Sequence, residues 1–350
     1  MNQIQKVWPM LVAGSLLVCQ PALAAEGLSI TSPGPRAQVV SVHNPLATVA
    51  FKPAPDVVDA MMDQAITNLT GQSSVGTAWA SLAGTNETYG IKVFTAPGSS
   101  TGTRPAVVAA VVRGLLAAGV PTNHIIIWDR HEADLRRAGY FELAEHFGVR
   151  VEGAAEAGYD AKTFYETAII GNLVYGDLEF GKKDEGVGRK SFVSKLVSQQ
   201  MTKIINIAPV LNHNGAGVAG NLFSLALGSV DNTVRFEVTP PRLATAVPEI
   251  YALPALGERV VLNISDALIC QYEGEERGLL HYSVDLNEIR LSRDPVALDV
   301  LALQDLERSR RLRSQVELPA NWELYKNAAL LELGVADPKH IDITTLKPAQ

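Results

Sequence analysis

An uninterrupted apolar segment constrains the fold of this chain more than any other feature of its sequence. Ile125-Ile-Ile-Trp128 precedes Asp129 and leaves no polar residue to face water. A strand that is apolar on both faces must be covered on both faces, which is typical of a parallel sheet between helices. The preceding segment, Pro105–Ala118, has a helical start at proline and a stop at Gly119. The pattern predicts an α/β fold with a mainly parallel sheet covered by helices on both faces.

The same alternation of strands and helices continues along the chain. Further strands are expected at 89–94, 149–152, 203–208, 260–264, 288–291 and 340–344, and helices at 56–69, 135–147, 218–227, 322–333 and from Asp294 onward. We therefore expect an α/β domain over 89–345, preceded by an extended segment and a helix over 25–88. Residues 153–198 are polar and contain glycine, which predicts an irregular excursion from the sheet.

The N-terminus has the three parts of a secretory signal peptide. Lys6 precedes the apolar run Val7–Cys19, and an Ala-x-Ala site follows at Ala22–Ala24. The apolar run is shorter than the about 20 residues that a membrane-spanning helix needs. Acylation of Cys19 is less favoured, because bulky Val18 precedes it. We expect cleavage after residue 24, a periplasmic location and no membrane span in the mature chain.

Charge and cysteine content exclude several classes of function. The net charge is −7, whereas a protein that binds nucleic acid through the phosphate backbone needs a basic surface. Beyond the signal segment, Cys270 is the one remaining cysteine. It can neither form an internal disulfide nor hold an iron–sulfur cluster. Nothing in the sequence identifies a protein partner, and the expected partner is a small molecule or a metal ion.

Four blocks in order carry a family resemblance. They are Gly90-Ile-Lys92 with Thr103–Val108 and the strand that ends at Asp129; Ile204–His213 with Gly217–Leu222; Leu262–Ala267 with Glu273-Gly274; and Ser292–Asp299. Together they resemble the family known as domain of unknown function 362, over residues of about 90 to 305. The resemblance implies an α/β fold and no particular reaction.

The chain departs from its relatives at two points. Many relatives carry ferredoxin-type cysteine clusters, and this chain has none. Relatives usually have two lysines in a Pro-Lys-x-Lys-Thr-His pattern, where this chain has Pro209-Val-Leu-Asn-His213. The histidine is kept and both cations are lost, so an anion held by those lysines in relatives loses its partners here.

The glycine-rich segment Asn212–Asn221 is a candidate binding loop, because it leaves a strand and opens a helix. Its glycines allow backbone N–H groups to converge, and a helix N-terminus favours an anion. The alternative is a tight structural turn, since the spacing fits neither a Walker loop nor a dinucleotide fingerprint. The candidate ligand-binding residues of this segment are Asn212, Asn214, Gly215, Gly217 and Asn221.

Two residues at strand ends are candidates for catalysis. His213 could act as an acid, a base or a ligand, and Asp129 could bind a metal, a hydroxyl or a cation. Lys92 and Arg104 are the nearest cations and could replace the missing lysines as anion partners. Because parallel strands place their carboxyl ends on one edge of the sheet, we expect these residues to meet there.

Carboxylates after another strand suggest a metal site. Asp266 and Glu273 follow the strand at 260–264 and could receive a divalent metal together with His213. Asp294 is explained as a helix cap, and Asp299 lies about one helical turn further on, so both are weaker candidates.

Two hypotheses of function remain open from sequence. One is a periplasmic enzyme or cofactor-dependent protein that uses His213, Asp129 and a cation, with a cofactor that the sequence does not name. The other is a non-catalytic protein that binds a small molecule or a metal.

Overall fold

A nine-stranded sheet organises the residues that the computed structural model describes, which are 35–182, 186–313 and 321–347. Its strand order is β13-β1-β12-β11-β9-β4-β5-β6, and β10 pairs with β9 at the side of this path. The strands are β1 (Ala37–His43), β4 (Tyr89–Lys92), β5 (Ile125–Asp129), β6 (Arg150–Gly153), β9 (Lys203–His213), β10 (Gly217–Val218), β11 (Val260–Gln271), β12 (Ser283–Ser292) and β13 (Ile341–Leu346).

The sheet is mainly parallel. Parallel pairing joins β13 to β1, β11 to β9, β9 to β4, β4 to β5 and β5 to β6. Strand β12 runs antiparallel to both β1 and β11. The expected α/β class is confirmed, with β12 as its antiparallel member.

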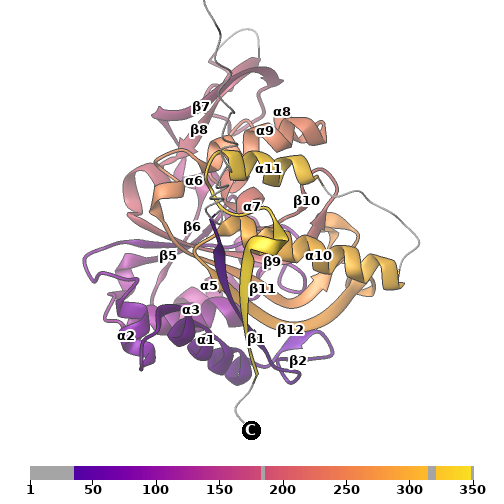
Figure 1. The fold of residues 1–350 in the computed structure, drawn as a ribbon. Helices are drawn as coiled ribbons and strands as arrows, with labels where there is room; N and C mark the ends of the chain where they lie inside the picture. Colours follow the sequence, from indigo (N-terminus) through magenta and orange to yellow (C-terminus); the bar gives the residue numbers. More distant parts are fainter. Residues whose placement is uncertain (1–34, 183–185, 314–320, 348–350) are drawn as a thin grey trace, which may run out of the picture. The chain divides into compact units, whose positions relative to one another are not determined.

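The sheet separates two hydrophobic cores, because strand side chains alternate between its faces. Ile125 and Ile127 enter one core, whereas Ile126 and Trp128 enter the other. The first core contains residues of α1 (Pro55–Thr70), α2 (Val75–Ala80), α3 (Pro105–Ala117) and α5 (Tyr140–Phe147). The second contains residues of α7 (Asn221–Gly228), α9 (Pro240–Tyr251), α10 (Pro295–Arg313) and α11 (Trp322–Leu330). Helices therefore cover both faces of the sheet (Figure 1).

The N-terminal part of the described chain belongs to the same unit as the rest. Strand β1 pairs with both β12 and β13, and α1 packs in the core that α3 also enters. Pro35–Gln350 is one compact unit, and the sheet includes β1, from the extended segment that the sequence placed before residue 89. A short hairpin of β2 (Thr48–Val49) and β3 (Lys52–Pro53) connects β1 to α1. The expected signal peptide lies outside the described residues.

The excursion at 153–198 is more regular than its composition predicted. Strands β7 (Tyr159–Asn172) and β8 (Val187–Ser194) form a separate antiparallel ribbon beside the main sheet (Figure 1). Two short helices pack against this ribbon. Helix α6 (Ala154–Ala157) contacts β8, and helix α8 (Val234–Glu237) contacts β7. The Leu135–Phe147 helix of the sequence prediction is two helices, α4 (Glu132–Arg137) and α5, separated by left-handed Gly139.

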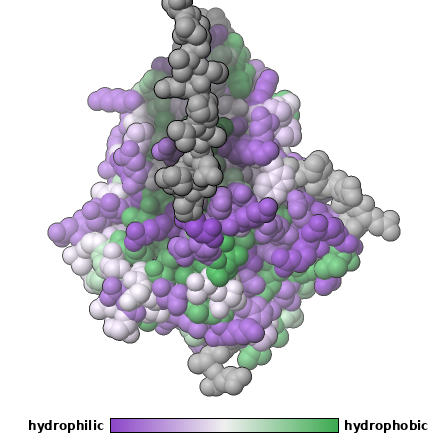
Figure 2. Space-filling model, viewed as in Figure 1, coloured by the Kyte–Doolittle hydropathy of each residue, from purple (hydrophilic) through white to green (hydrophobic). Residues whose placement is uncertain are grey.

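The surface is mixed in polarity. Hydrophilic residues occupy much of the face shown in Figure 2, with apolar areas between them. Within the described residues, no helix combines the length and the hydropathy needed to cross a bilayer.

Candidate functional site

A buried polar network lies where β4 and β5 end. The Lys92 ammonium donates to Asp129 Oδ1 at 2.8 Å, to Ser224 Oγ at 3.0 Å and to the Val93 carbonyl at 2.6 Å. Asp129 Oδ2 accepts from the Thr95 backbone N–H at 2.8 Å and from its hydroxyl at 2.6 Å. Parallel strands β4 and β5 bring the two charges to one edge, as the sequence argument required.

Lys92 has no unused donor, because an ammonium group has three N–H bonds and all three are engaged. Its side chain is fully buried, and this burial lowers its pKa, while Asp129 raises it in part. Gly228 permits this depth, since a Cβ there would lie 2.5 Å from Lys92 Cε. Lys92 and Asp129 thus form a buried ion pair, in which the ammonium group fixes the position of the Asp129 carboxylate.

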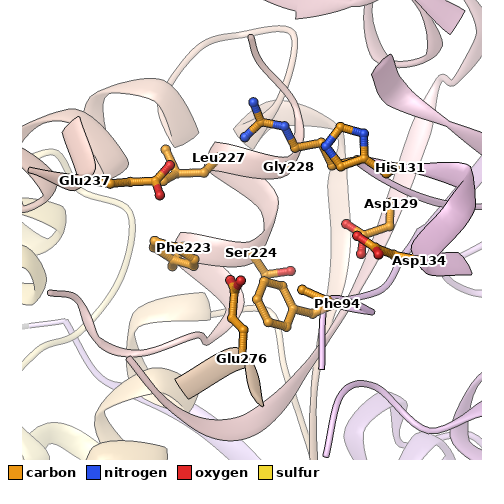
Figure 3. Close-up of a pocket in the computed structure, with 12 residues that line it drawn as sticks. Phe94, Asp129, His131, Asp134, Phe223, Ser224, Leu227, Gly228, Glu237 and Glu276 are labelled. Atoms are coloured by element: carbon orange, nitrogen blue, oxygen red, sulfur yellow. The ribbon is translucent and has the colours of Figure 1, made fainter. Parts of the chain in front are cut away.

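A cavity of about 220 Å³ lies next to this pair (Figure 3). Asp129 and Ser224 line it, and Lys92 lies behind them. The other lining residues are Phe94, Ala96, Arg130, His131, Asp134, Phe223, Leu227, Gly228, Glu237 and Glu276. In Figure 3 the Glu237 and Glu276 carboxylates lie across from Asp129 and Asp134, with the Ser224 hydroxyl between them.

His213 lies in a second hollow, of about 510 Å³, which shares Glu237 and Glu276 with the cavity. Its Nδ1 accepts the backbone N–H groups of Gly215 at 3.2 Å and Ala216 at 3.0 Å. The proton of the neutral ring is therefore on Nε2. Burial lowers the pKa of His213, although Glu275 and Glu237 act in the opposite direction. The ring is a neutral hydrogen-bond donor that packs 4.2 Å from the Phe223 ring centroid.

The asparagines near His213 organise the rim of this second hollow. Asn212 Oδ1 accepts the Glu275 backbone N–H at 3.0 Å, and the Asn214 backbone N–H donates to Glu275 Oε1 at 2.9 Å. Asn214 and Gly215 line the hollow, whereas Asn212 is buried beneath it. Asn212 thus attaches the 275–277 turn to the end of β9.

The N-terminus of α7 already holds an anion, and that anion is a side chain of the protein. The Asn221 and Leu222 backbone N–H groups donate to the Asp299 carboxylate at 2.6 and 2.9 Å. The Asn221 side-chain amide donates to it as well, at 3.2 Å. Burial raises the pKa of Asp299 to about 7, although these bonds act in the opposite direction. The binding-loop interpretation of Asn221 is therefore replaced by an internal cap from Asp299, a residue that sequence reasoning had ranked low.

The glycines of this turn serve packing. A Cβ on Gly220 would lie 2.2 Å from Asp299 Oδ1. Gly217 has a φ of +93°, and a Cβ there would lie 2.8 Å from Leu303 Cδ2. Both positions therefore need glycine for space or for backbone conformation, without any ligand.

Arg104 and Asp266 pair with each other away from the cavity. Arg104 Nη1 lies 2.8 Å from Asp266 Oδ1, and the Arg104 backbone N–H donates to Asp266 Oδ2 at 2.8 Å. Both side chains are buried. Arg104 is thus not placed to replace the missing lysines.

The expected metal site is not formed by these residues. Asp266 is occupied by Arg104, and His213 and Glu273 are not gathered with it. Across the described ranges, no group of three His, Cys, Asp or Glu side chains could hold a metal ion. Cys270 is buried and its pKa is raised, mainly by burial, to about 12, which fits an inert core thiol.

Sequence reasoning missed most of the cavity wall. Phe223 with Leu227, and Ser224 with Gly228, lie four residues apart, so they share one side of α7 and reach the cavity together. This spacing could have indicated a common face. Glu237 and Glu276 had no such signal, because they come from short elements that only the tertiary fold brings together.

The fold and this cavity define a class: an α/β protein with a polar cavity at the carboxyl ends of parallel strands. Residues 91–304 match the family described as Domain of unknown function (DUF362). The chain belongs to this family, which confirms the resemblance of the four sequence blocks.

Comparison with solved structures matches this chain to the crystal structure of a protein from Thermotoga maritima. The two chains share 12% identity, with a TM-score of 0.39 over 75% of this chain and 60% of that chain. The present chain thus spans about three fifths of that protein. No curated protein matches this sequence.

Proposed function

We propose that this DUF362 protein is an exported, non-catalytic binding protein whose small-molecule ligand occupies the cavity beside Lys92 and Asp129. The supporting observation is the cavity of about 220 Å³ at the carboxyl edge of β4 and β5. Such an edge is where open α/β sheets bind ligands.

Binding is favoured over catalysis because Lys92, Asp129 and His213, the groups that the sequence offered for catalysis, are engaged with the protein itself. A general acid or base must reach the proton that it moves. Lys92 and Asp129 bind each other within 2.8 Å, and the Nδ1 of His213 is held by two backbone N–H groups. These groups can position a ligand, whereas none of them is poised to exchange a proton with it.

Export is the second part of the proposal, and it rests on the order of Lys6, the apolar run and Ala22–Ala24. We expect protein from the periplasmic fraction to begin Ala25-Glu-Gly when its N-terminus is sequenced. An intact Met1 on protein recovered with the membrane would contradict cleavage.

Filling the cavity should abolish ligand binding without unfolding the protein. Ala96 is half-buried and lines the cavity, and its carbonyl contact with Arg137 does not involve the side chain. We expect Ala96→Trp to occupy the space that a ligand needs. In a thermal-shift screen of small metabolites, compounds that raise the Tm of wild type should leave the Tm of Ala96→Trp unchanged.

The control is Ala80→Trp, at an exposed position at the end of α2, which should respond like wild type. Equal shifts in wild type and Ala96→Trp, or no shift with any compound, would reject the cavity as a binding site. Bound compound should be recovered unchanged after incubation, and its conversion would argue for an enzyme.

A further inference from the structure

The cavity carries more negative charge than its own cations neutralise. Asp129 is paired with Lys92, and Asp134 with Arg137 at 2.7 Å. Glu237 and Glu276 have no ion-pair partner among the residues that the structure describes. The pKa of Glu276 is raised by burial first, and then by Glu237 and other carboxylates around the cavity. Both side chains line the cavity and are exposed to solvent, so two carboxylates remain available to a positively charged ligand.

The basic side chains that line the cavity interact with groups other than Glu237 and Glu276. Arg130 Nη1 donates to Thr233 Oγ1 at 2.7 Å, and the guanidinium lies close enough to Asp231 to oppose the rise in its pKa. His131 lies 4.0 Å from Glu156. Arg277 lines the adjoining hollow with Glu237, Glu275 and Glu276, and its Nε donates to the Gly274 carbonyl at 3.1 Å. Three carboxylates thus face one guanidinium there, and the region stays negative.

Aromatic side chains form another part of the wall. The Phe94 and Phe223 rings meet edge to face, with centroids 6.4 Å apart. Their apolar surface suits an organic cation, which is weakly hydrated and is attracted by aromatic faces. A metal ion would need several converging ligands, and the described residues offer no such group.

The Ser224 hydroxyl is an independent sign of a ligand. Ser224 is only 2% exposed, and its oxygen accepts from Lys92 at 3.0 Å. Its own proton has no acceptor among the described residues, and the hydroxyl is directed into the cavity (Figure 3). Beside it, Asp129 Oδ1 accepts one bond, from Lys92, and retains capacity for a second. A ligand hydroxyl would accept from Ser224 and donate to Asp129.

We propose that the cavity binds a small organic cation that also carries a hydroxyl group, with its ammonium near Glu237 and Glu276 and its hydroxyl at Ser224 and Asp129. This inference rests on the proposed binding function and names its ligand class. An apolar cavity of about 150 Å³ holds one benzene molecule. The present cavity, of about 220 Å³, therefore admits roughly ten non-hydrogen atoms.

The test compares matched probes by isothermal titration calorimetry on the purified mature protein. The amino alcohols are ethanolamine, choline and 2-aminocyclohexanol. Ethylene glycol, 3,3-dimethylbutan-1-ol and cyclohexane-1,2-diol replace the charged group with a neutral one, cyclohexylamine lacks the hydroxyl, and lactate is an anion. At least one amino alcohol should bind about tenfold more tightly than its neutral counterpart and than cyclohexylamine, since one decade of affinity corresponds to one good polar contact.

Variants assign the two halves of the ligand. Glu237→Gln with Glu276→Gln should weaken amino-alcohol binding about tenfold, whereas Glu145→Gln, on α5 away from the cavity, should not change it. Ser224→Ala should weaken the binding of hydroxyl-bearing cations about fivefold and leave the binding of cyclohexylamine unchanged. Tm is measured for each variant, so that loss of fold is not read as loss of binding.

The outcomes separate this inference from the function on which it rests. If cyclohexane-1,2-diol or lactate binds at least as tightly as the amino alcohols, and Ala96→Trp blocks that binding, the cavity binds ligands but the cation proposal is wrong. If no amino alcohol exceeds its neutral counterpart, the cation proposal is also overturned. If Ala96→Trp blocks no binding at all, the proposed function itself fails.

Discussion

Replacing Lys92 with Met should lower the free energy of unfolding by about 3–5 kcal/mol, the usual cost of leaving one partner of a buried ion pair uncompensated. Met keeps most of the side-chain volume, so the loss comes from charge and hydrogen bonding. Asp129 would keep its two bonds from Thr95 but lose its counter-ion, and Ser224 would lose its donor. Urea unfolding followed by circular dichroism measures the change.

A second variant separates charge from packing. Lys92→Met combined with Asp129→Asn removes both charges, and it should be more stable than Lys92→Met alone by about 2 kcal/mol. Arg113→Met is the matched control, because Arg113 and Asp59 are 43% and 31% exposed and their pair should contribute less than about 1 kcal/mol. If Lys92→Met and Arg113→Met cost the same, the buried network is not what holds this edge of the sheet together.

Gly220→Val should cost about 4 kcal/mol, because the new side chain would occupy the place of the Asp299 carboxylate. A Cβ at this position lies 2.2 Å from Asp299 Oδ1. Either α7 moves, or the Asp299 carboxylate moves away from the N-terminus of α7. In the second case, the backbone N–H groups of Asn221 and Leu222 would be buried without an acceptor. Overpacking costs about 1–3 kcal/mol, and each buried unsatisfied donor about 1–3 kcal/mol more.

The melting temperature distinguishes this structural role from a ligand-binding role of the same glycine. We expect Gly220→Val to have a lower Tm than wild type, with or without ligand. Gly84→Ala is the control, because Gly84 is exposed and a Cβ there meets only Glu87 Cγ at 3.5 Å. Its Tm should stay close to that of wild type. A Gly220→Val protein with unchanged Tm and lost ligand would restore the binding-loop interpretation of this turn.

The pattern of strands and helices could be predicted because it depends on local chemistry. Ile125–Trp128 is apolar on both faces, and it lies between two cores as that pattern requires. Strand bounds were less accurate. Strand β9 continues from the expected 208 to His213, and β11 from 264 to Gln271, because polar residues such as Asn212 and Asp266 are paired inside the fold rather than exposed.

The β7–β8 ribbon was missed for a related reason. Strand β7 alternates between buried and exposed positions only in part, and β7 and β8 form a two-stranded sheet separate from the main one. The composition of 153–198 therefore resembles a loop, and pairing between distant residues was needed to recognise strands.

The candidate site was predictable only where it depends on strand ends. Lys92 and Asp129 follow from the parallel pairing of β4 and β5, and they are bonded to each other. Arg104 and Asp266 also come together, but as a closed pair outside the cavity. Residue type and strand position cannot show whether a charge meets a ligand or another side chain.

The sequence alone determined the α/β class, the family and the edge of the sheet at which polar groups gather, because apolar periodicity and strand direction are encoded locally. The tertiary structure decided which of those groups remain available. Asp299, distant in the chain, caps α7 and closes the expected anion site, while Glu237, Glu276 and Ser224 converge from separate elements to line the cavity. These contacts join residues far apart in sequence, and burial rather than residue type sets whether each charge is paired or free.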